Sequence, residues 1–266
     1  MTQQIFEQQA LPMEQLEEIG LAKNGKILLE PDNLRALLEG RRSDMIKLEN
    51  LNFAGFNIAS LNAKLSLKPA KNGGLDILIH PLYVDILPPS YLTLDEIESL
   101  EKGETASVQK TIKGEDGKPQ DVLVEFDRET NEFIITDTDK ILVPDMVNSE
   151  YLTADQKERY RKGKIVELSD GTKFQFAGTE RQGIRSDKLA LIASVLVDGG
   201  LSYILYKGLN ALINRKRDEK AAAINGKGYN LAHDNMQAHE RVVKVGKQQS
   251  PKDEQERGYT RTGRSR

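Results

Sequence analysis

The phrase YLTLDEIESLEKGE occupies Tyr91–Glu104, and a near copy, YLTADQKERYRKGK, occupies Tyr151–Lys164. In each copy a threonine, Thr93 or Thr153, is followed three residues later by Glu or Gln. This is the spacing of a capping box, in which the hydroxyl accepts a hydrogen bond from a free helical N–H and the Glu or Gln reaches back. The two phrases therefore predict two short helices with the same start.

Each predicted helix is expected to end at Lys-Gly and to lead into a β-hairpin. Gly103 and Gly163 suit the left-handed conformation that ends many helices. In the first copy TASVQKTIKG and QDVLVEFD flank the turn GEDGKP, and in the second KIVELS and KFQFAGT flank Asp170-Gly171. A further turn at 127–131 separates VLVEF from FIITD. Two related helix-hairpin units are thus predicted, over residues 91–150 and 151–186.

Residues 1–90 predict a pair of helices followed by a hairpin. The first helix lies in LPMEQLEEIGL and ends near Gly20, and the second lies in PDNLRALLEGRR, with Asp32 as its cap and Gly40 at its end. The alternation in LNAKLSLK and the turn in KPAKNGGLDILIH indicate two paired strands.

The fold class expected is α+β, with short helices alternating with β-hairpins in two related helix-hairpin units. An apolar helical segment at 187–213 and a disordered basic tail at 214–266 complete the prediction. The chain of 266 residues is 38% hydrophobic and 30% charged, which is too apolar for disorder throughout.

No catalytic, cofactor-binding or metal-binding residue is predicted, and we expect a protein that is not an enzyme. Cysteine is absent, which excludes disulfides and thiolate chemistry, and phosphate-binding loops and the GxSxG motif are also absent. His80 beside Pro81 is interpreted as structural, and His233 and His239 miss the i, i+4 spacing of a helical metal pair. The carboxylates at 127–139 are interpreted as a solvated hairpin rim.

The most hydrophobic segment, LALIASVLVDGGLSYILYKGLNALI at 189–213, is the predicted contact surface. It is long enough to span a bilayer as a helix, but a central Asp198 costs about 2.5–3.5 kcal/mol in lipid. Two amphipathic helices that pack on the hairpin units, on a second copy or on a membrane surface are the alternative. The stripe of the second helix consists of Leu201, Ile204, Leu205, Leu209 and Leu212.

The tail carries most of the basic character of a chain whose net charge is −3. Residues 214–266 contain 13 Lys and Arg against 7 Asp and Glu. Arg215, Lys216 and Arg217 are the candidates for contacts to nucleic-acid or lipid phosphates. The N-terminus, MTQQIFEQQA, lacks the features of a secretory signal, so we expect a cytoplasmic protein, or alternatively a membrane-associated one.

Two quoted phrases carry a family resemblance. VEFDRETNEFIITDTDKILVPD, followed by YLTADQKERYRKGKIVEL, resembles the domains of unknown function numbered 4099 and 3945 in conjugative-element proteins of the Bacteroidetes. GIRSDKLALIASVLVDGGLSYILYKGLNALI resembles the second of these domains. The resemblance extends over residues 11–213 and implies a DNA-transfer setting, but no activity, cofactor or substrate.

The function expected is that of a non-catalytic interaction or scaffold protein of a mobile genetic element. It would bind a protein partner, or itself, through residues 189–213. The alternatives are a nucleic-acid accessory protein that uses the tail and a membrane-associated component anchored by 189–213.

Overall fold

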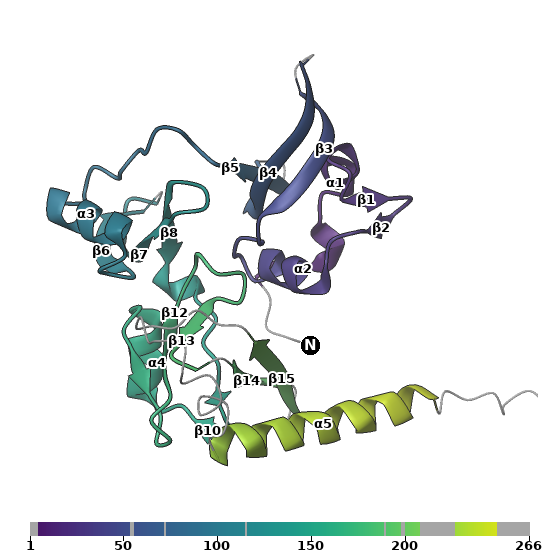
Figure 1. Cartoon of the computed structure of the whole chain (residues 1–266), viewed down its shortest axis with the longest axis vertical. Helices are drawn as coiled ribbons and strands as arrows, with labels where there is room; N and C mark the ends of the chain where they lie inside the picture. The colour runs from purple at the N-terminus through teal and green to yellow at the C-terminus, as the bar shows by residue number, and fades with distance from the viewer. Residues whose placement is uncertain are drawn as a thin grey trace, which may run out of the picture.

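The computed structural model describes residues 5–53, 56–71, 73–114, 116–188, 190–197, 200–207 and 227–248. Short helices alternate with small antiparallel sheets along this part of the chain, which confirms the α+β class. Figure 1 shows the N-terminal part at the upper right, the middle part at the upper left and the remaining sheets below them.

One unit, a short helix followed by a three-stranded antiparallel sheet, occurs three times. The N-terminal module contains α2 (Pro31–Leu38), β3 (Ile46–Phe53), β4 (Phe56–Pro69) and β5 (Leu75–Pro81). The middle module contains α3 (Leu94–Lys102), β6 (Val108–Lys113), β7 (Pro119–Asp127) and β8 (Glu132–Asp137). The third module contains α4 (Ala154–Arg161), β11 (Val166–Glu167), β12 (Lys173–Phe176) and β13 (Ile184–Ser186). In each module the strand order follows the sequence and the helix packs on the central strand.

The repeated phrase folds as predicted from its threonine onward. Thr93 and Thr153 both form complete capping boxes, and Gly103 and Gly163 both have positive φ, at 70° and 64°. The tyrosines that open the phrase differ, because the Tyr91 hydroxyl is buried whereas Tyr151 is 60% exposed. The repeat therefore begins at the helix cap and not at the tyrosine.

The N-terminal module carries additional elements and its own core. A 3₁₀ turn η1 (Gln8–Ala10), a helix α1 (Met13–Glu18) and a small hairpin of β1 (Ala22–Lys23) and β2 (Lys26–Ile27) precede α2. Asp32 is not the cap of α2, because the helix begins one residue earlier, with Glu30 at the cap position and Pro31 at the first turn. Its core, which includes Leu16, Leu37, Leu48 and Leu65, lies between these helices and one face of the sheet.

The predicted apolar helical segment is wrong, because residues 190–207 form a β-hairpin. β14 (Ala190–Val197) pairs with β15 (Gly200–Lys207), and β14 also pairs with β9 (Met146–Val147), which pairs with β10 (Glu150–Tyr151). Residues 191–194 of β14 are all buried, so both of its faces are covered. A strand buried on both faces is apolar throughout, and in the sequence it resembles a buried helix.

The predicted disordered tail is corrected in its central part, where α5 (Lys227–Gln248) packs against β14. Ala232 and Met236, four residues apart on this helix, are buried. Figure 1 shows α5 along the lower edge of the molecule. The remaining tail residues, 214–226 and 249–266, lie outside the described residues.

A 3₁₀ turn, η2 (Thr138–Lys140), follows β8 and leads towards the third module. The core of that module combines α4, its sheet, β9 and β14. Tyr160 of α4 packs against the rings of Phe174 and Phe176 at 5.9 Å and donates its hydroxyl proton to the carbonyl oxygen of Gly183. This core also receives Leu123 from β7, so the middle and third modules share apolar packing.

Candidate functional site

The central strand of the middle module, β7, presents its two faces to different parts of the protein. Val122 and Val124 belong to the core under α3. On the opposite face Leu123, Glu125 and Asp127 are all at most 2% exposed and meet the other two modules. Two buried carboxyl groups on an intermodule face define the candidate site, because buried ionisable groups require specific partners.

Lys64 of β4 contacts all three modules. Its ammonium nitrogen lies 2.9 Å from Asp127 Oδ2, 2.7 Å from Glu129 Oε2 and 3.2 Å from the carbonyl oxygen of Thr179. Burial alone would lower the pKa of Lys64, but Asp127 and Glu129 outweigh it and hold the pKa above its usual value. The lysine is therefore charged and fixes the turn after β7 to the N-terminal module.

Lys64 and the two buried carboxyl groups, Glu125 and Asp127, form a polar junction between the modules. Arg42 and His80 extend this polar junction toward β8. The Arg42 guanidinium donates hydrogen bonds to Glu132 at 2.6 Å and to Thr130 Oγ1 at 3.1 Å. His80 lies between the Ser66 hydroxyl at 2.8 Å and Glu132 at 3.2 Å. Burial, and then the charge of Arg42, lowers the pKa of His80, so its ring is neutral at pH 7. His80 of β5 contacts both β4 and β8.

Glu125 is the second buried carboxyl group of the junction. Its side chain accepts a hydrogen bond of 2.7 Å from the backbone N–H of Gly178 in the third module. Burial raises the pKa of Glu125 to about 7, partly opposed by this hydrogen bond and by Arg185. A Cβ on residue 178 would lie 2.7 Å from the Glu125 oxygen, so only glycine allows this close approach.

The N-terminal and third modules also meet directly through Arg181. Its guanidinium lies 2.7 Å from Asp44, and its carbonyl oxygen accepts a hydrogen bond of 3.1 Å from Arg41 Nε. Arg41 in turn pairs with Glu39 and packs over Gly183, where a Cβ would meet the Arg41 side chain at 2.7 Å. The junction is thus closed on this side by ion pairs that are only partly exposed.

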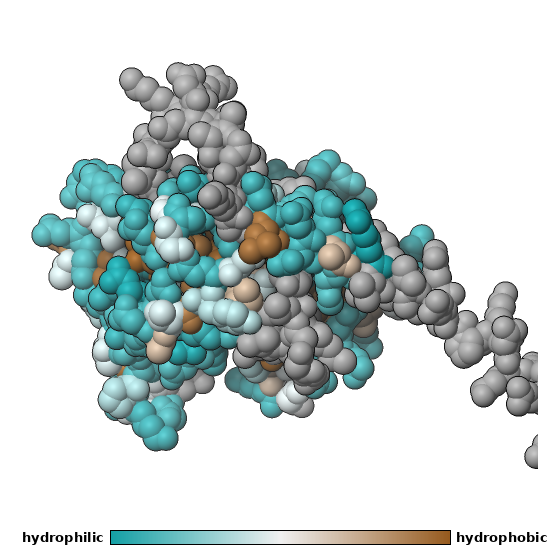
Figure 2. Space-filling view, turned by 90° about the horizontal axis from the view of Figure 1, so that it is seen from below, coloured by the Kyte–Doolittle hydropathy of each residue, from teal (hydrophilic) through white to brown (hydrophobic). Residues whose placement is uncertain are grey.

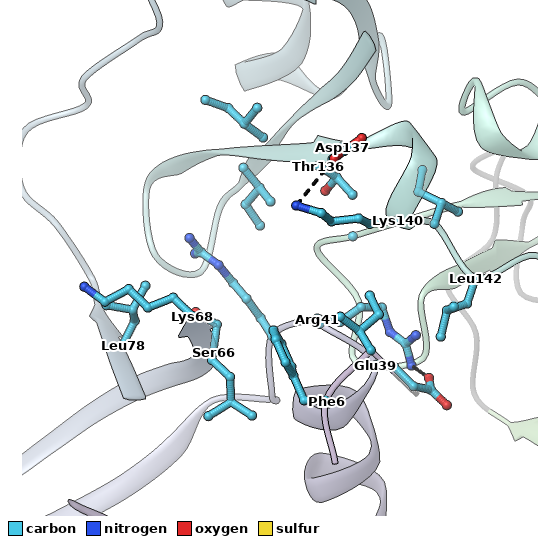
Figure 3. A pocket seen from close by; sticks show the side chains of 18 of the residues that line it. Phe6, Glu39, Arg41, Ser66, Lys68, Leu78, Thr136, Asp137, Lys140 and Leu142 are labelled. Carbon is cyan, nitrogen blue, oxygen red and sulfur yellow. Dashed lines mark hydrogen bonds and ion pairs between the residues drawn. The ribbon is translucent and has the colours of Figure 1, made fainter. Parts of the chain in front are cut away.

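A cavity of about 370 Å³ opens beside the polar junction. Its walls come from the loop after α2, from β4 and β5, from β8 with η2, and from the segment that follows β12. Figure 3 shows Phe6, Ser66, Lys68 and Leu78 on one side of this space and Thr136, Asp137 and Lys140 across from them. Phe6 is positioned because its N–H, like that of Ile5, donates to the carbonyl oxygen of Leu38 at the end of α2.

The junction pairs its own charges with one another. Lys64, Arg42, His80 and Arg181 each lie within ion-pair distance of a carboxylate of the chain. In the part of the chain that the structure describes, no group of three acidic or histidine side chains has the geometry to hold a metal ion.

The interaction residues predicted from the sequence are only partly described. Leu201, Ile204 and Leu205 lie in β15, where the register places Ile204 opposite Ala193 and Leu205 opposite Ile192. Neighbouring strand positions belong to opposite faces, so the predicted helical stripe is divided between the two faces of the sheet. The remaining predicted residues, Leu209, Leu212, Arg215, Lys216 and Arg217, lie outside the described residues.

The polar junction itself was missed by the sequence reasoning. Asp127, interpreted as part of a solvated rim, is 2% exposed. Lys64 stands between apolar residues in LNAKLSLK, where alternation predicts a solvent-facing position. The pair joins residues 63 positions apart, so no local pattern connects them.

The face of the molecule shown in Figure 2 is mainly hydrophilic. On the face shown in Figure 2 hydrophobic residues form small separate areas. The connection from β5 to α3 is different, because Leu82, Val84 and Leu87 are 61%, 94% and 84% exposed. Among the described helices none combines the length and the apolar character needed to cross a bilayer.

Residues 6–86 match the family described as Protein of unknown function (DUF4099). The matched region contains the whole N-terminal module with its preceding helix and hairpin. No curated protein and no solved structure matches the chain. The match supports an uncharacterised domain in this region, which includes Arg42, Lys64 and His80 of the polar junction.

Proposed function

We propose that this chain is a non-catalytic interaction protein that binds a strand of another protein chain along β15. The observation that carries the proposal is the place of β15 in its sheet. The strand order is β10-β9-β14-β15, so within the described residues β15 pairs on one side only. An eight-residue edge strand offers a row of backbone donors and acceptors that a strand of a partner can complete.

The sequence of β15 favours such pairing. GLSYILYK is rich in aromatic and β-branched or aliphatic residues, contains no proline and has its one charge at the end. Natural edge strands that avoid association are usually short or interrupted by charges or proline. β15 has none of these protective features over its first seven residues. The partner strand comes from a second copy of this chain or from another protein.

The setting proposed for this interaction is a conjugative mobile element. Its support is the resemblance of the segments at 124–168 and 183–213 to domains of such elements, together with the family match over residues 6–86. The partner is then a protein encoded by the same element or a second copy of this chain.

Proline substitutions along β15 test the proposal. Successive residues of an antiparallel strand direct their N–H groups alternately toward and away from the paired neighbour. Ile192 and Ser194 direct their backbone groups to β9, so Ala193 and its partner Ile204 bond to each other. Ile204→Pro therefore removes an N–H that bonds to β14, whereas Tyr203→Pro, the outward variant, removes an N–H that points away from the sheet. The outward variant is expected to retain the circular dichroism spectrum and to lose association, as measured by light scattering of the full chain.

A photo-crosslinking residue at position 203 identifies the partner in cells. The expected result is one crosslinked product, which is absent when Leu205, the next residue with an outward N–H, is also replaced by proline. If the full chain is monomeric at every concentration tested and position 203 gives no crosslinked product, the proposed function is wrong.

A further inference from the structure

The cavity between the modules has a charge distribution of its own. Four cationic side chains and two carboxylates are among its lining residues. Arg41 pairs with Glu39, Lys140 lies 3.4 Å from Asp137, and Arg42 pairs with Glu132. Lys68 has no carboxylate within 4.0 Å in the described part of the chain, and Asp76, which lies opposite it on β5, is not among the lining residues of the cavity.

The remaining lining of the cavity is apolar and partly aromatic. Phe6, Leu78, Ile135, Leu142 and Phe176 come from five different segments and contribute to its walls. A cavity of about 370 Å³ is within the range of small-molecule sites, about 300–1,000 Å³, which combine apolar walls with a few placed polar groups. A cation beside an apolar wall suits a ligand with an apolar body and one negative group.

We infer that this cavity binds a small amphipathic anion, with its apolar body against the phenylalanine and leucine side chains and its carboxylate at Lys68. Lys68 lies on the face of β4 that also carries Lys64 and Ser66, opposite the face that forms the N-terminal core. Figure 3 shows the Lys68 side chain beside Leu78, so the charge and an apolar wall are adjacent.

The site depends on the assembly of the modules. Phe6, Lys68 and Leu78 belong to the N-terminal part, Ile135 and Leu142 to the middle part and Phe176 to the third module. A ligand that contacts all of them stabilises the junction, because binding to the folded state alone raises the free energy of unfolding. This inference does not depend on β15 or on the proposed partner.

Isothermal titration calorimetry of the full chain with octanoate, acetate and octyltrimethylammonium tests the inference. Octanoate is expected to bind at one site, acetate not to bind for lack of an apolar body, and the ammonium compound not to bind because of its charge. Lys68→Met is expected to weaken octanoate binding about tenfold, equivalent to about 1.4 kcal/mol. Leu78→Trp, which fills the cavity, is expected to abolish it.

Lys47→Met is the matched control, because Lys47 is exposed on β3 and absent from the cavity lining. It is expected to bind octanoate as the wild type does. Circular dichroism shows whether Leu78→Trp is folded. If it is not, Lys68→Met alone decides the outcome, because Lys68 is exposed and its replacement does not disturb the core. Absence of octanoate binding, equal binding by Lys68→Met, or equal binding of octyltrimethylammonium would overturn the assignment.

Discussion

Among the described residues, Glu125 is one whose protonation the fold changes strongly. It is 1% exposed, and its pKa is raised from 4.5 to about 7. In the folded protein it therefore holds a proton that the unfolded chain has released between these two pH values. The contribution of Glu125 to stability is fully present below pH 4.5 and is lost as pH rises through about 7.

Glu125→Gln is expected to remove this pH dependence. The amide oxygen can still accept the Gly178 N–H, but the group no longer ionises. Relative to the wild type, the variant should become more stable as pH rises from 5 to 8, by on the order of 3 kcal/mol. Urea unfolding at several pH values measures this difference. The exposed Glu104→Gln is the control, and parallel pH profiles for wild type and Glu125→Gln would contradict the prediction.

At the scale of the element, the repeated phrase shows how much structure a local signal determines. Leu92 and Leu152 precede the two caps, and Leu100 and Tyr160 provide the buried helical side chain of each module. All four are at most 9% exposed. Leu100 in one module corresponds to Tyr160 in the other. The two modules therefore bury the same helical position with different side chains.

The two caps are expected to be of equal importance. Thr93→Ala and Thr153→Ala each leave a helical N–H without its partner and should cost about 1 kcal/mol of stability. Thr→Ser at the same positions retains the hydroxyl and should cost much less. Thermal unfolding of the four variants measures the effect. A large loss for only one alanine variant would show that the two helices do not contribute equally.

The elements predicted correctly have signals within a few residues. The capping boxes, the glycine at φ 74° after α2 and the hairpin turns all depend on neighbours in the sequence. The hairpin at 190–207 is predicted to be helical because Leu201, Ile204 and Leu205 begin a stripe at helical spacing, although the segment forms β14 and β15. The register of β14 with β9, more than 40 residues earlier, decides the strand structure.

The sequence does not predict the polar junction or the cavity, because both depend on which modules meet in space. The alternation in β4 shows that Lys64 and Ser66 share a face, but it indicates solvent on that face. The structure places the middle module there instead. Which modules meet is a property of their tertiary arrangement, and a single sequence does not contain a local sign of it.

At the scale of the whole molecule, Lys64 connects the three modules through one buried ammonium group. Its side chain and that of Asp127 are each only 3% exposed. Removal of one member of a buried pair leaves the other charge without compensation, which costs about 3–5 kcal/mol. An exposed pair such as Lys47 with Glu49 remains hydrated in both states and contributes little to stability.

Lys64→Met is therefore expected to destabilise the full chain by about 3–5 kcal/mol and to uncouple its modules. Calorimetric unfolding should change from one transition to two, because the N-terminal module retains its own core. Lys47→Met should leave the profile unchanged. A Lys64→Met variant with a single transition at the wild-type temperature would show that the pair does not hold the modules together.

The family match ends at residue 86, and this boundary separates the basic residues of the junction from their acidic partners. Arg42, Lys64 and His80 lie within the matched domain, whereas Asp127 and Glu132 do not. In this chain the matched domain supplies the cations of Lys64 and Arg42, and the sequence after it supplies the carboxylates that pair with them. The matched domain therefore needs acidic side chains from the sequence that follows it, and here β7 and β8 of the sheet that covers it supply them.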